Sequence, residues 1–478
     1  MPVVQPTPQT QADRFSQTKT VRFLRQCQQQ AADAHQAKIA SLSYKIAPLA
    51  PWTALQALAQ TRKRHFYYDP PQQPSVVGVG VLVGASATGS TRFDQAQKFI
   101  QRWRSHFLYA SQNKADRLGR FFCSATFFDE TTTATHTVTS PHLEAFEPAY
   151  IFVPQIQVST QLDSSTVTFN SLIDQTTEIE QLAAHLHTQL EQLISAKPGG
   201  SAQSASSKII TKNVLGFATA VETVLQTVKT GELHKVVLAD VMDVVAPQAI
   251  DEVKSLHTLR QNHPDCTVFA VSNGKGQSFI GASPERLLSI DQGQLATDAL
   301  AGSAPRSALC GIDHQLAQSL LHSEKERYEH SVVVDFIARQ LRSLNLIPLY
   351  ANAPQILQLA HIQHLHTPIS ASLKQQNVSP LEVLHKLHPT PAVAGLPRQL
   401  ACDLIRQHET FDRGLYAAPL GWIDTEGNSE FIVGIRSALI NGCKARLYAG
   451  AGIVTGSQPA KELAEIKLKL QTLLNALV

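Results

Sequence analysis

Three charged side chains in the segment 208–478 of this 478-residue chain interrupt apolar or turn-like sequence. Lys235 begins the run KVVL, Glu285 follows the turn sequence GASP, and Arg436 ends the apolar run FIVGIR. A buried lysine can act as a general base, and a carboxyl group that burial keeps protonated can act as a general acid. An arginine in an apolar strand needs an anionic partner, either a structural acid or a substrate carboxylate. The structural alternatives are an exposed strand end for Lys235 and a turn carboxylate paired with Arg286 for Glu285.

Carboxylates also occur on two helices that lie far apart in the sequence. Glu326 and Glu329 are spaced i,i+3 within SEKERYEHS, so they share one helix face, and Glu465 lies in the final helix, KELAEIKLK. The structural interpretation is a solvated face with i,i+4 ion pairs such as Glu465 with Lys469. Alternatively, carboxylates from both helices hold one Mg²⁺ ion, which prefers oxygen ligands.

Two further patterns are weaker indications of a binding site. His361, His364 and His366 cluster, but their spacing matches no common zinc motif, which favours one functional or core histidine with surface neighbours. Gly450 and Gly452, in YAGAGIV, would allow backbone N–H groups to approach an anion closely.

Composition excludes several broad classes of protein. The net charge is only +3, which argues against a nucleic-acid-binding protein. The most apolar segment, 76–87, is too short and too rich in glycine to cross a bilayer. None of the six cysteines lies in a CxxC pair, so we expect reduced thiols and a cytoplasmic protein.

The elements that must position these residues alternate irregularly between strands and helices. The pattern predicts helices over 20–45, 315–344, 380–387 and 397–408, and strands over 235–245, 267–272, 294–300 and 430–439. Interleaved runs of this kind favour an α+β fold over a regular βαβ repeat. The Gly/Ser-rich residues 201–207 are predicted to form a flexible loop between an N-terminal half, 1–200, and a core, 208–478.

The order of the motifs resembles that of the chorismate-utilising enzymes, which include anthranilate, aminodeoxychorismate, salicylate and isochorismate synthases. The matching segments are, in order, KVVL, GASPE, ALAGSAPR, EHSVVVDFI, LHPTPAVAGLP, FDRGLYAAPLGW, EFIVGIRSA, YAGAGIVTGS and KELAEIKLK. They cover residues 208–478 densely, whereas residues 1–200 match loosely, as the family's variable N-terminal half. The resemblance implies one α+β unit of two stacked antiparallel sheets, a sandwich with helices outside and the active site between its halves.

Three positions within these motifs resemble the isochorismate synthases of the family. Lys235 stands where the ammonia-using members carry glutamine. Ala301 stands where aminodeoxychorismate synthases carry a nucleophilic lysine. The segment HPTPAVAG, 388–395, resembles the isochorismate synthase form of its loop rather than the salicylate synthase form.

The resemblance also implies a reaction and a set of site residues. Lys235 would be the base that activates water for attack on C2 of chorismate, and Glu285 the acid that protonates the departing C4 hydroxyl. Glu329 and Glu465 would bind Mg²⁺, the one cofactor expected. The substrate would contact Arg436, Lys469, Tyr416, His364, Ser303, Gly302, Ala301, Gly450 and Gly452.

The sequence departs from the family pattern at several positions, and two rival functions stay open. Asp240 stands where an arginine is common, Glu326 where aspartate is common, and Ala418 where glycine is common. The nearest rival is a salicylate synthase, which adds pyruvate elimination, and the next is an ammonia-using component with an amidotransferase partner. We expect a monomer without an obligatory protein partner. Its product would serve menaquinone or phylloquinone, siderophore or salicylate synthesis.

Overall fold

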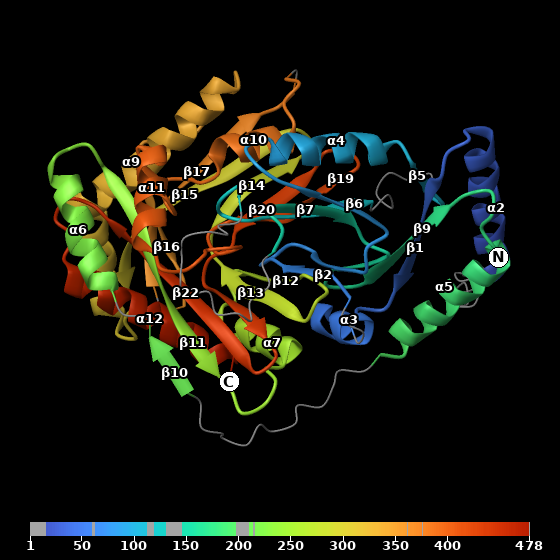
Figure 1. Ribbon diagram of the computed structural model, residues 1–478, viewed down its shortest axis with the longest axis horizontal. Helices are drawn as coiled ribbons and strands as arrows, with labels where there is room; N and C mark the ends of the chain where they lie inside the picture. Colours follow the sequence, from blue (N-terminus) through green and yellow to red (C-terminus); the bar gives the residue numbers. More distant parts are fainter. Residues whose placement is uncertain are drawn as a thin grey trace, which may run out of the picture.

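The structure, a computed structural model, describes residues 16–59, 63–111, 119–130, 146–196, 210–213, 216–360, 362–374 and 376–477. The predicted flexible loop, 201–207, lies outside the described residues. Most of the described chain forms two large β-sheets with helices around them (Figure 1). The predicted α+β class and the sandwich of two sheets are confirmed, although one strand pair, β1 with β5, is parallel.

The first sheet has 13 strands and combines strands from both halves of the sequence. Its order is β10 (Ile210–Asn213), β11 (Lys235–Val245), β22 (Lys444–Ile453), β21 (Ser437–Asn441), β13 (Gln277–Ser283), β12 (Thr267–Ser272), β2 (His65–Asp69), β3 (Ser75–Val79), β8 (Ile156–Thr160), β9 (Ser165–Ile173), β1 (Lys38–Ile46) and β5 (Phe107–Tyr109), with β18 (Gly395–Leu396) paired to β11. Every residue of β12 and β13 is buried, and the largely apolar run of β12 is of the kind expected at the centre of a sheet.

The second sheet has nine strands and also draws on both halves. Its order is β16 (Gln355–Gln358), β17 (Ile362–Ser372), β15 (Gln294–Pro305), β14 (Arg286–Asp291), β20 (Ser429–Val433), β19 (Pro419–Asp424), β6 (Arg120–Ala125), β7 (Ala149–Val153) and β4 (Val83–Ala87). One continuous apolar core includes residues of both sheets. For example, the ring centroids of Phe66 on β2 and Phe122 on β6 are 5.0 Å apart.

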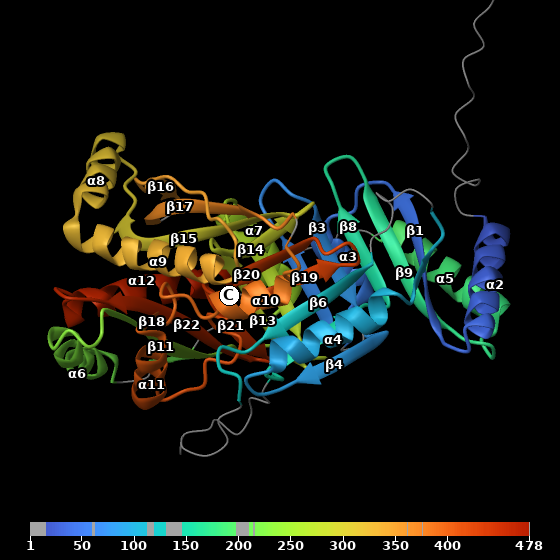
Figure 2. The same ribbon diagram turned by 90° about the horizontal axis from the view of Figure 1, so that it is seen from above.

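Helices cover the outer sides and the ends of the two sheets (Figures 1 and 2). They are α2 (Gln17–Asp33), α3 (Pro51–Leu58), α4 (Arg92–Arg104), α5 (Ile179–Ile194), α6 (Phe217–Lys229), α7 (Glu252–Asn262), α8 (Cys310–His322), α9 (Glu324–Ser343), α10 (Pro380–Leu387), α11 (Arg398–His408) and α12 (Pro459–Leu477). Figure 2 shows α2 and α5 together at one end of the molecule, where they cover a second, smaller apolar core with β1, β8 and β9.

Two helix predictions were wrong in extent. The helix predicted over 20–45 ends at Asp33, because His35 adopts a left-handed backbone conformation with φ of 49° and residues 38–46 pair with β9 instead. The helix predicted over 315–344 is divided in two at Ser323, whose extended backbone ends α8. The Ser323 hydroxyl then caps α9 by accepting a hydrogen bond from the backbone N–H of Glu326.

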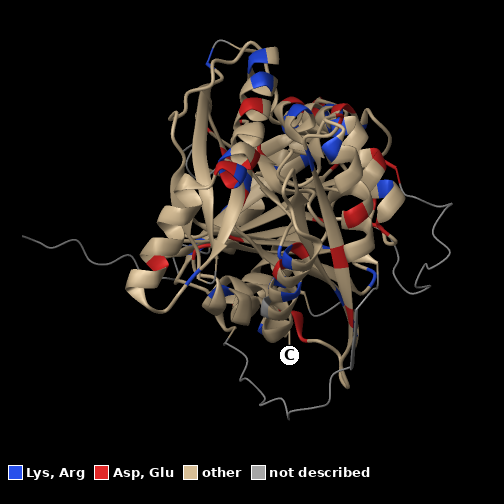
Figure 3. Cartoon of the chain, turned by 90° about the vertical axis from the view of Figure 1, so that its left-hand side faces the viewer, with Lys and Arg blue, Asp and Glu red and all other residues tan. Residues whose placement is uncertain are grey.

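Charge is distributed without large blocks of one sign. In Figure 3, segments of Lys and Arg alternate with segments of Asp and Glu on the same helices, in keeping with the small net charge of the chain. No helix in the described ranges is both long enough and apolar enough to cross a membrane.

Candidate active site

Two connections that cross between the sheets bring Glu285 and Arg436 to one pocket. Glu285 lies between β13 of the first sheet and β14 of the second, and Arg436 lies between β20 of the second sheet and β21 of the first. The crossings are fastened together, since the Val433 backbone N–H donates to the Glu285 carbonyl and the Ala282 N–H donates to the Arg436 carbonyl, both at 3.1 Å. Arg436 has a left-handed backbone, with φ of 51°, which is uncommon for a non-glycine residue and often occurs at functional sites.

The pocket between the sheets has about 990 Å³ of space, part of it open to solvent. Twelve of the thirteen predicted site residues line it, namely Glu285, Ala301, Gly302, Ser303, Glu329, His364, Tyr416, Arg436, Gly450, Gly452, Glu465 and Lys469. The remaining one, Lys235, lies immediately behind Gly452, where a side chain would meet Lys235 Cε at 3.2 Å. Residues spread over more than 230 positions of sequence therefore converge on one site.

Lys235 is almost fully buried, with 1% of its surface exposed, at the start of β11. Its Nζ lies 2.8 Å from Glu329 Oε1 on α9. Gly452 packs against both members of this pair, because a Cβ there would lie 2.6 Å from Glu329 Oε1 and 3.2 Å from Lys235 Cε. Lys235 is therefore not the exposed strand end of the structural interpretation.

Glu285 is buried, and burial raises the pKa of its carboxyl group to about 8. Lys235 acts to lower this pKa and Asp298 acts to raise it, but burial is the largest influence. The carboxyl group therefore carries its proton at neutral pH and faces the pocket as a potential acid. A turn carboxylate paired with Arg286 would not behave in this way, and Arg286 lies instead 3.6 Å from Asp298.

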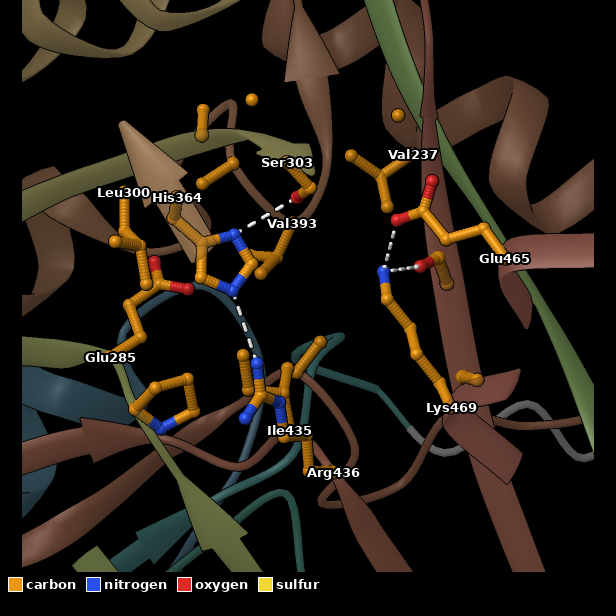
Figure 4. A pocket seen from close by; sticks show the side chains of 18 of the residues that line it. Val237, Glu285, Leu300, Ser303, His364, Val393, Ile435, Arg436, Glu465 and Lys469 are labelled. Carbon is orange, nitrogen blue, oxygen red and sulfur yellow. Dashed lines mark hydrogen bonds and ion pairs between the residues drawn. The ribbon is translucent and has the colours of Figure 1, made fainter. Parts of the chain in front are cut away.

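His364 on β17 links Ser303 on β15 to Arg436 (Figure 4). Arg436 donates to His364 Nε2 at 3.1 Å, and His364 Nδ1 lies 2.9 Å from Ser303 Oγ. Burial, with Arg436 and Lys469, holds the pKa of His364 well below its usual range, so the ring is neutral. Because a guanidinium only donates, Nδ1 must carry the proton and donate it to Ser303, which leaves the Ser303 hydroxyl proton for a ligand.

Arg436 itself is a half-buried cation at the pocket wall. No ion pair between described residues includes it, and its other polar neighbour is Cys266 Sγ at 3.8 Å. Of the two partners considered for Arg436, the structural acid is thus missing within the described ranges. An anionic group of a ligand is the remaining partner of the kind that a guanidinium prefers.

Four glutamates from two helices form an oxygen-rich end of the pocket, which we call the glutamate cluster. Glu326 and Glu329 lie on α9, and Glu462 and Glu465 lie on α12, each pair at i,i+3 spacing. Burial and then Glu329 raise the pKa of Glu326. Burial likewise raises the pKa of Glu462, with a further contribution from Glu465.

Three lysine ammonium groups balance this cluster. Lys235 pairs with Glu329 at 2.8 Å, Lys469 with Glu465 at 2.7 Å, and Lys325 with Glu462 at 3.4 Å. With these pairings, no three carboxylates within the described ranges come together as a metal site. The donor set nevertheless has the chemistry that Mg²⁺ needs, since it consists of carboxylates that already gather cations at the pocket.

The sequence analysis did not single out Lys325 or Glu462, and it named Glu326 only as a neighbour of Glu329 on one helix face and as a departure from the family pattern. The signal was present, because Glu462 precedes Glu465 by three residues, as Glu326 precedes Glu329. His330, next to Glu329, has a structural role: its Nε2 lies 2.7 Å from Thr367 Oγ1, which fixes α9 against β17.

The departures Asp240 and Ala418 do not disrupt the site. Asp240 on β11 is buried, and burial raises the pKa of its carboxyl group to about 6. Nearby Glu409 is neutralised by the fully buried Arg413, with which it forms an ion pair. Ala418 is buried beside Ala417, whose backbone is left-handed with φ of 59°.

Comparison with known proteins adds independent evidence. Residues 22–478 match the family model described as "Chorismate binding enzyme". The chain belongs to the chorismate-binding enzyme family. The family resemblance predicted from the motifs is therefore confirmed, and it extends over the N-terminal half as well as the core.

Relatives within the chorismate-binding family carry closely agreeing names. The chain is 33% identical over 447 residues to the "Salicylate biosynthesis isochorismate synthase" of Pseudomonas aeruginosa, covering 92% of this chain and 90% of that one. It is 31% identical over 467 residues to "Isochorismate synthase MenF" of Bacillus subtilis, covering 94% and 95%. The solved menaquinone-specific isochorismate synthase MenF from Escherichia coli has a TM-score of 0.75 at 27% identity, covering 95% of this chain and 100% of that one.

Proposed function

We propose that this chain is an isochorismate synthase, an isomerase that interconverts chorismate and isochorismate with the help of Mg²⁺. The observation that carries the proposal is a buried, protonated carboxyl group, Glu285, in the same pocket region as the buried Lys235–Glu329 pair. An acid and a base held in one pocket are what the addition of water and the loss of a hydroxyl require. The names of the full-length relatives support the same reaction.

Lys235 is proposed as the base. Lys235 pairs with Glu329 as an ammonium group in this structure, so it must first give up a proton. As a neutral amine it would then take a proton from a water molecule, and that water would attack C2 of the chorismate ring. Lys235 is buried against Gly452, which lies on β22, the strand that pairs with β11. The ammonia-using members of the family would not need this base, so Lys235 favours water as the nucleophile.

Glu285 is proposed as the acid. As the ring double bonds shift, the C4 hydroxyl departs, and hydroxide is a poor leaving group unless it is protonated. Glu285 supplies that proton, which its raised pKa keeps in place at neutral pH. In the reverse direction the same two residues exchange roles, so the reaction is reversible.

The other pocket residues are proposed to orient the substrate. Chorismate has two carboxylates, and Arg436 offers a guanidinium that no described acid occupies. The Ser303 hydroxyl is oriented by His364 to donate into the pocket. Tyr416 stacks on Tyr448, with centroids 5.2 Å apart, and Gly450 leaves room for the Tyr416 hydroxyl, which a Cβ would meet at 2.7 Å.

Glu329 and Glu465 are proposed to hold Mg²⁺ at the glutamate cluster. When bound there, Mg²⁺ would neutralise a substrate carboxylate and fix its position. The cluster supports this proposal because its carboxylates come from two helices and face one pocket.

The test is chromatography of products after the protein is incubated with chorismate and Mg²⁺ without ammonia. The proposal predicts isochorismate in equilibrium with chorismate. Salicylate with pyruvate would instead identify a salicylate synthase, and no turnover until an amidotransferase and glutamine are added would identify an ammonia-using component. We expect the active species to be a cytoplasmic monomer, which light scattering of the active fraction would test for oligomeric state.

A further inference from the structure

Lys325 bridges the two helices that carry the glutamate cluster. Its Nζ lies 3.4 Å from Glu462 Oε1 on α12 and 3.5 Å from Glu326 Oε1 on its own helix, α9. The Glu462 side chain is only 7% exposed, whereas the Lys325 side chain keeps 35% of its surface exposed. A single ammonium group therefore offsets carboxylates from both helices at the edge of the pocket.

The three lysines of this region differ in their freedom to leave. Lys235 has 1% of its side chain exposed and lies 2.8 Å from Glu329. Lys469 is held twice, by Glu465 at 2.7 Å and by the Gly450 carbonyl, to which it donates at 2.9 Å. Lys325 makes longer contacts with two carboxylates and has a flexible, partly exposed stem, so its head can turn into water.

We propose that Lys325 is a tethered cation that a divalent metal must displace from the glutamate cluster, so that this lysine sets the apparent affinity for Mg²⁺. The inference rests on the proposed Mg²⁺ site. An ammonium group and Mg²⁺ compete for the same carboxylate oxygens and repel each other at short range. Lys325 thus balances the cluster when no metal is bound and weakens the binding of the metal that replaces it.

The test compares Lys325→Gln with the wild type by calorimetric titration of Mg²⁺ in the absence of chorismate. The Kd for Mg²⁺ is expected to fall about tenfold, a change of about 1.4 kcal/mol. Lys467→Gln is the matched control, since Lys467 is an exposed lysine of the same helix as Glu462, and it should leave the Kd unchanged. Lys325→Met removes the charge by a different substitution and should tighten binding similarly if Lys325→Gln fails to fold.

A second readout separates displacement from a structural role. Melting temperature in EDTA should be lower for Lys325→Gln than for the wild type, because the bridge to Glu462 is lost. At saturating Mg²⁺ the two proteins should melt together, since the lysine no longer bridges the helices. If Lys325 only supports the fold, Lys325→Gln would lower the melting temperature by the same amount in EDTA and at saturating Mg²⁺. That result would overturn the inference.

The Mg²⁺ titration distinguishes a wrong role for Lys325 from a wrong metal site. If the wild type binds Mg²⁺ and neither Lys325 variant binds it more tightly, the inference is wrong while the site stands. If the wild type shows neither heat of binding nor a stability gain with Mg²⁺, the metal site is wrong and the inference falls with it.

Discussion

Glu285→Gln should make the protein more stable at alkaline pH while it removes the proposed acid. The pKa of the Glu285 carboxyl is raised from 4.5 to about 8 by burial, so the folded protein holds a proton that the unfolded chain releases. The wild type therefore loses stability as pH rises from about 4.5 to about 8, and the loss is complete above that range. Glutamine has no proton to lose, so the variant escapes this penalty.

The size of the effect follows from the two pKa values. The interval between 4.5 and about 8 corresponds to at most about 5 kcal/mol at pH 9, since each pKa unit represents about 1.4 kcal/mol. Burial is close to complete at Glu285, so solvent screening does little to reduce this limit. The gain should be present in full at pH 9, partial at pH 7 and small at pH 5.

The assay is thermal unfolding of both proteins at pH 5, 7 and 9, with turnover of chorismate measured in parallel. Glu222→Gln is the matched control, because Glu222 is exposed on α6. Removal of its charge should leave the free energy of unfolding unchanged at each pH. Turnover by the wild type should fall above about pH 8, where Glu285 loses its proton. A stability difference between Glu285→Gln and the wild type that is the same at pH 5 and pH 9 would refute the reasoning.

Three further predictions concern the proposed base Lys235, the proposed metal ligand Glu465, and Gly452, which packs against the Lys235–Glu329 pair. Lys235→Ala should lower turnover by about 10²- to 10⁴-fold, the range for general-base catalysis, with circular dichroism unchanged; wild-type turnover would remove Lys235 as the base. Glu465→Gln should raise the Mg²⁺ concentration for half-maximal activity roughly tenfold or more, and an identical Mg²⁺ titration would exclude Glu465 from the metal site. Gly452→Ala should push the Glu329 carboxylate from a Cβ 2.6 Å away and lower turnover about a hundredfold, with little change in melting temperature; near-normal turnover would show that the Lys235–Glu329 geometry is not critical.

The two proposed catalytic side chains could be singled out from the sequence because each lies at the end of a strand that the sequence predicts. Glu285 follows a Ser-Pro turn at a strand end, and Lys235 begins a run of buried β-branched residues. The apolar runs of β11 and β12 predicted their strands at the bounds that the structure shows. Local sequence, however, left the alternatives open, and only the order of the motifs pointed to one family.

What the sequence could not reveal depends on contacts between distant segments. The helix predicted through residue 45 ends early because 38–46 finds a partner in β9, and pairing in a sheet overrides a modest helix preference. The cap at Ser323 divides a continuous helical pattern. The balance between Lys325 and Glu462 requires α9 and α12 to meet across 137 positions of sequence, which no local pattern encodes.

The most direct test of the account is to follow the oxygen atom. The protein is incubated with chorismate and Mg²⁺ in water enriched in ¹⁸O, and the isolated isochorismate is analysed by mass spectrometry. Attack of water on C2 with loss of the C4 hydroxyl predicts one ¹⁸O atom in each isochorismate molecule, and reversal predicts label in the remaining chorismate. Unlabelled isochorismate would mean that the hydroxyl migrates within the substrate, and it would contradict the assignment of Lys235 and Glu285 as base and acid.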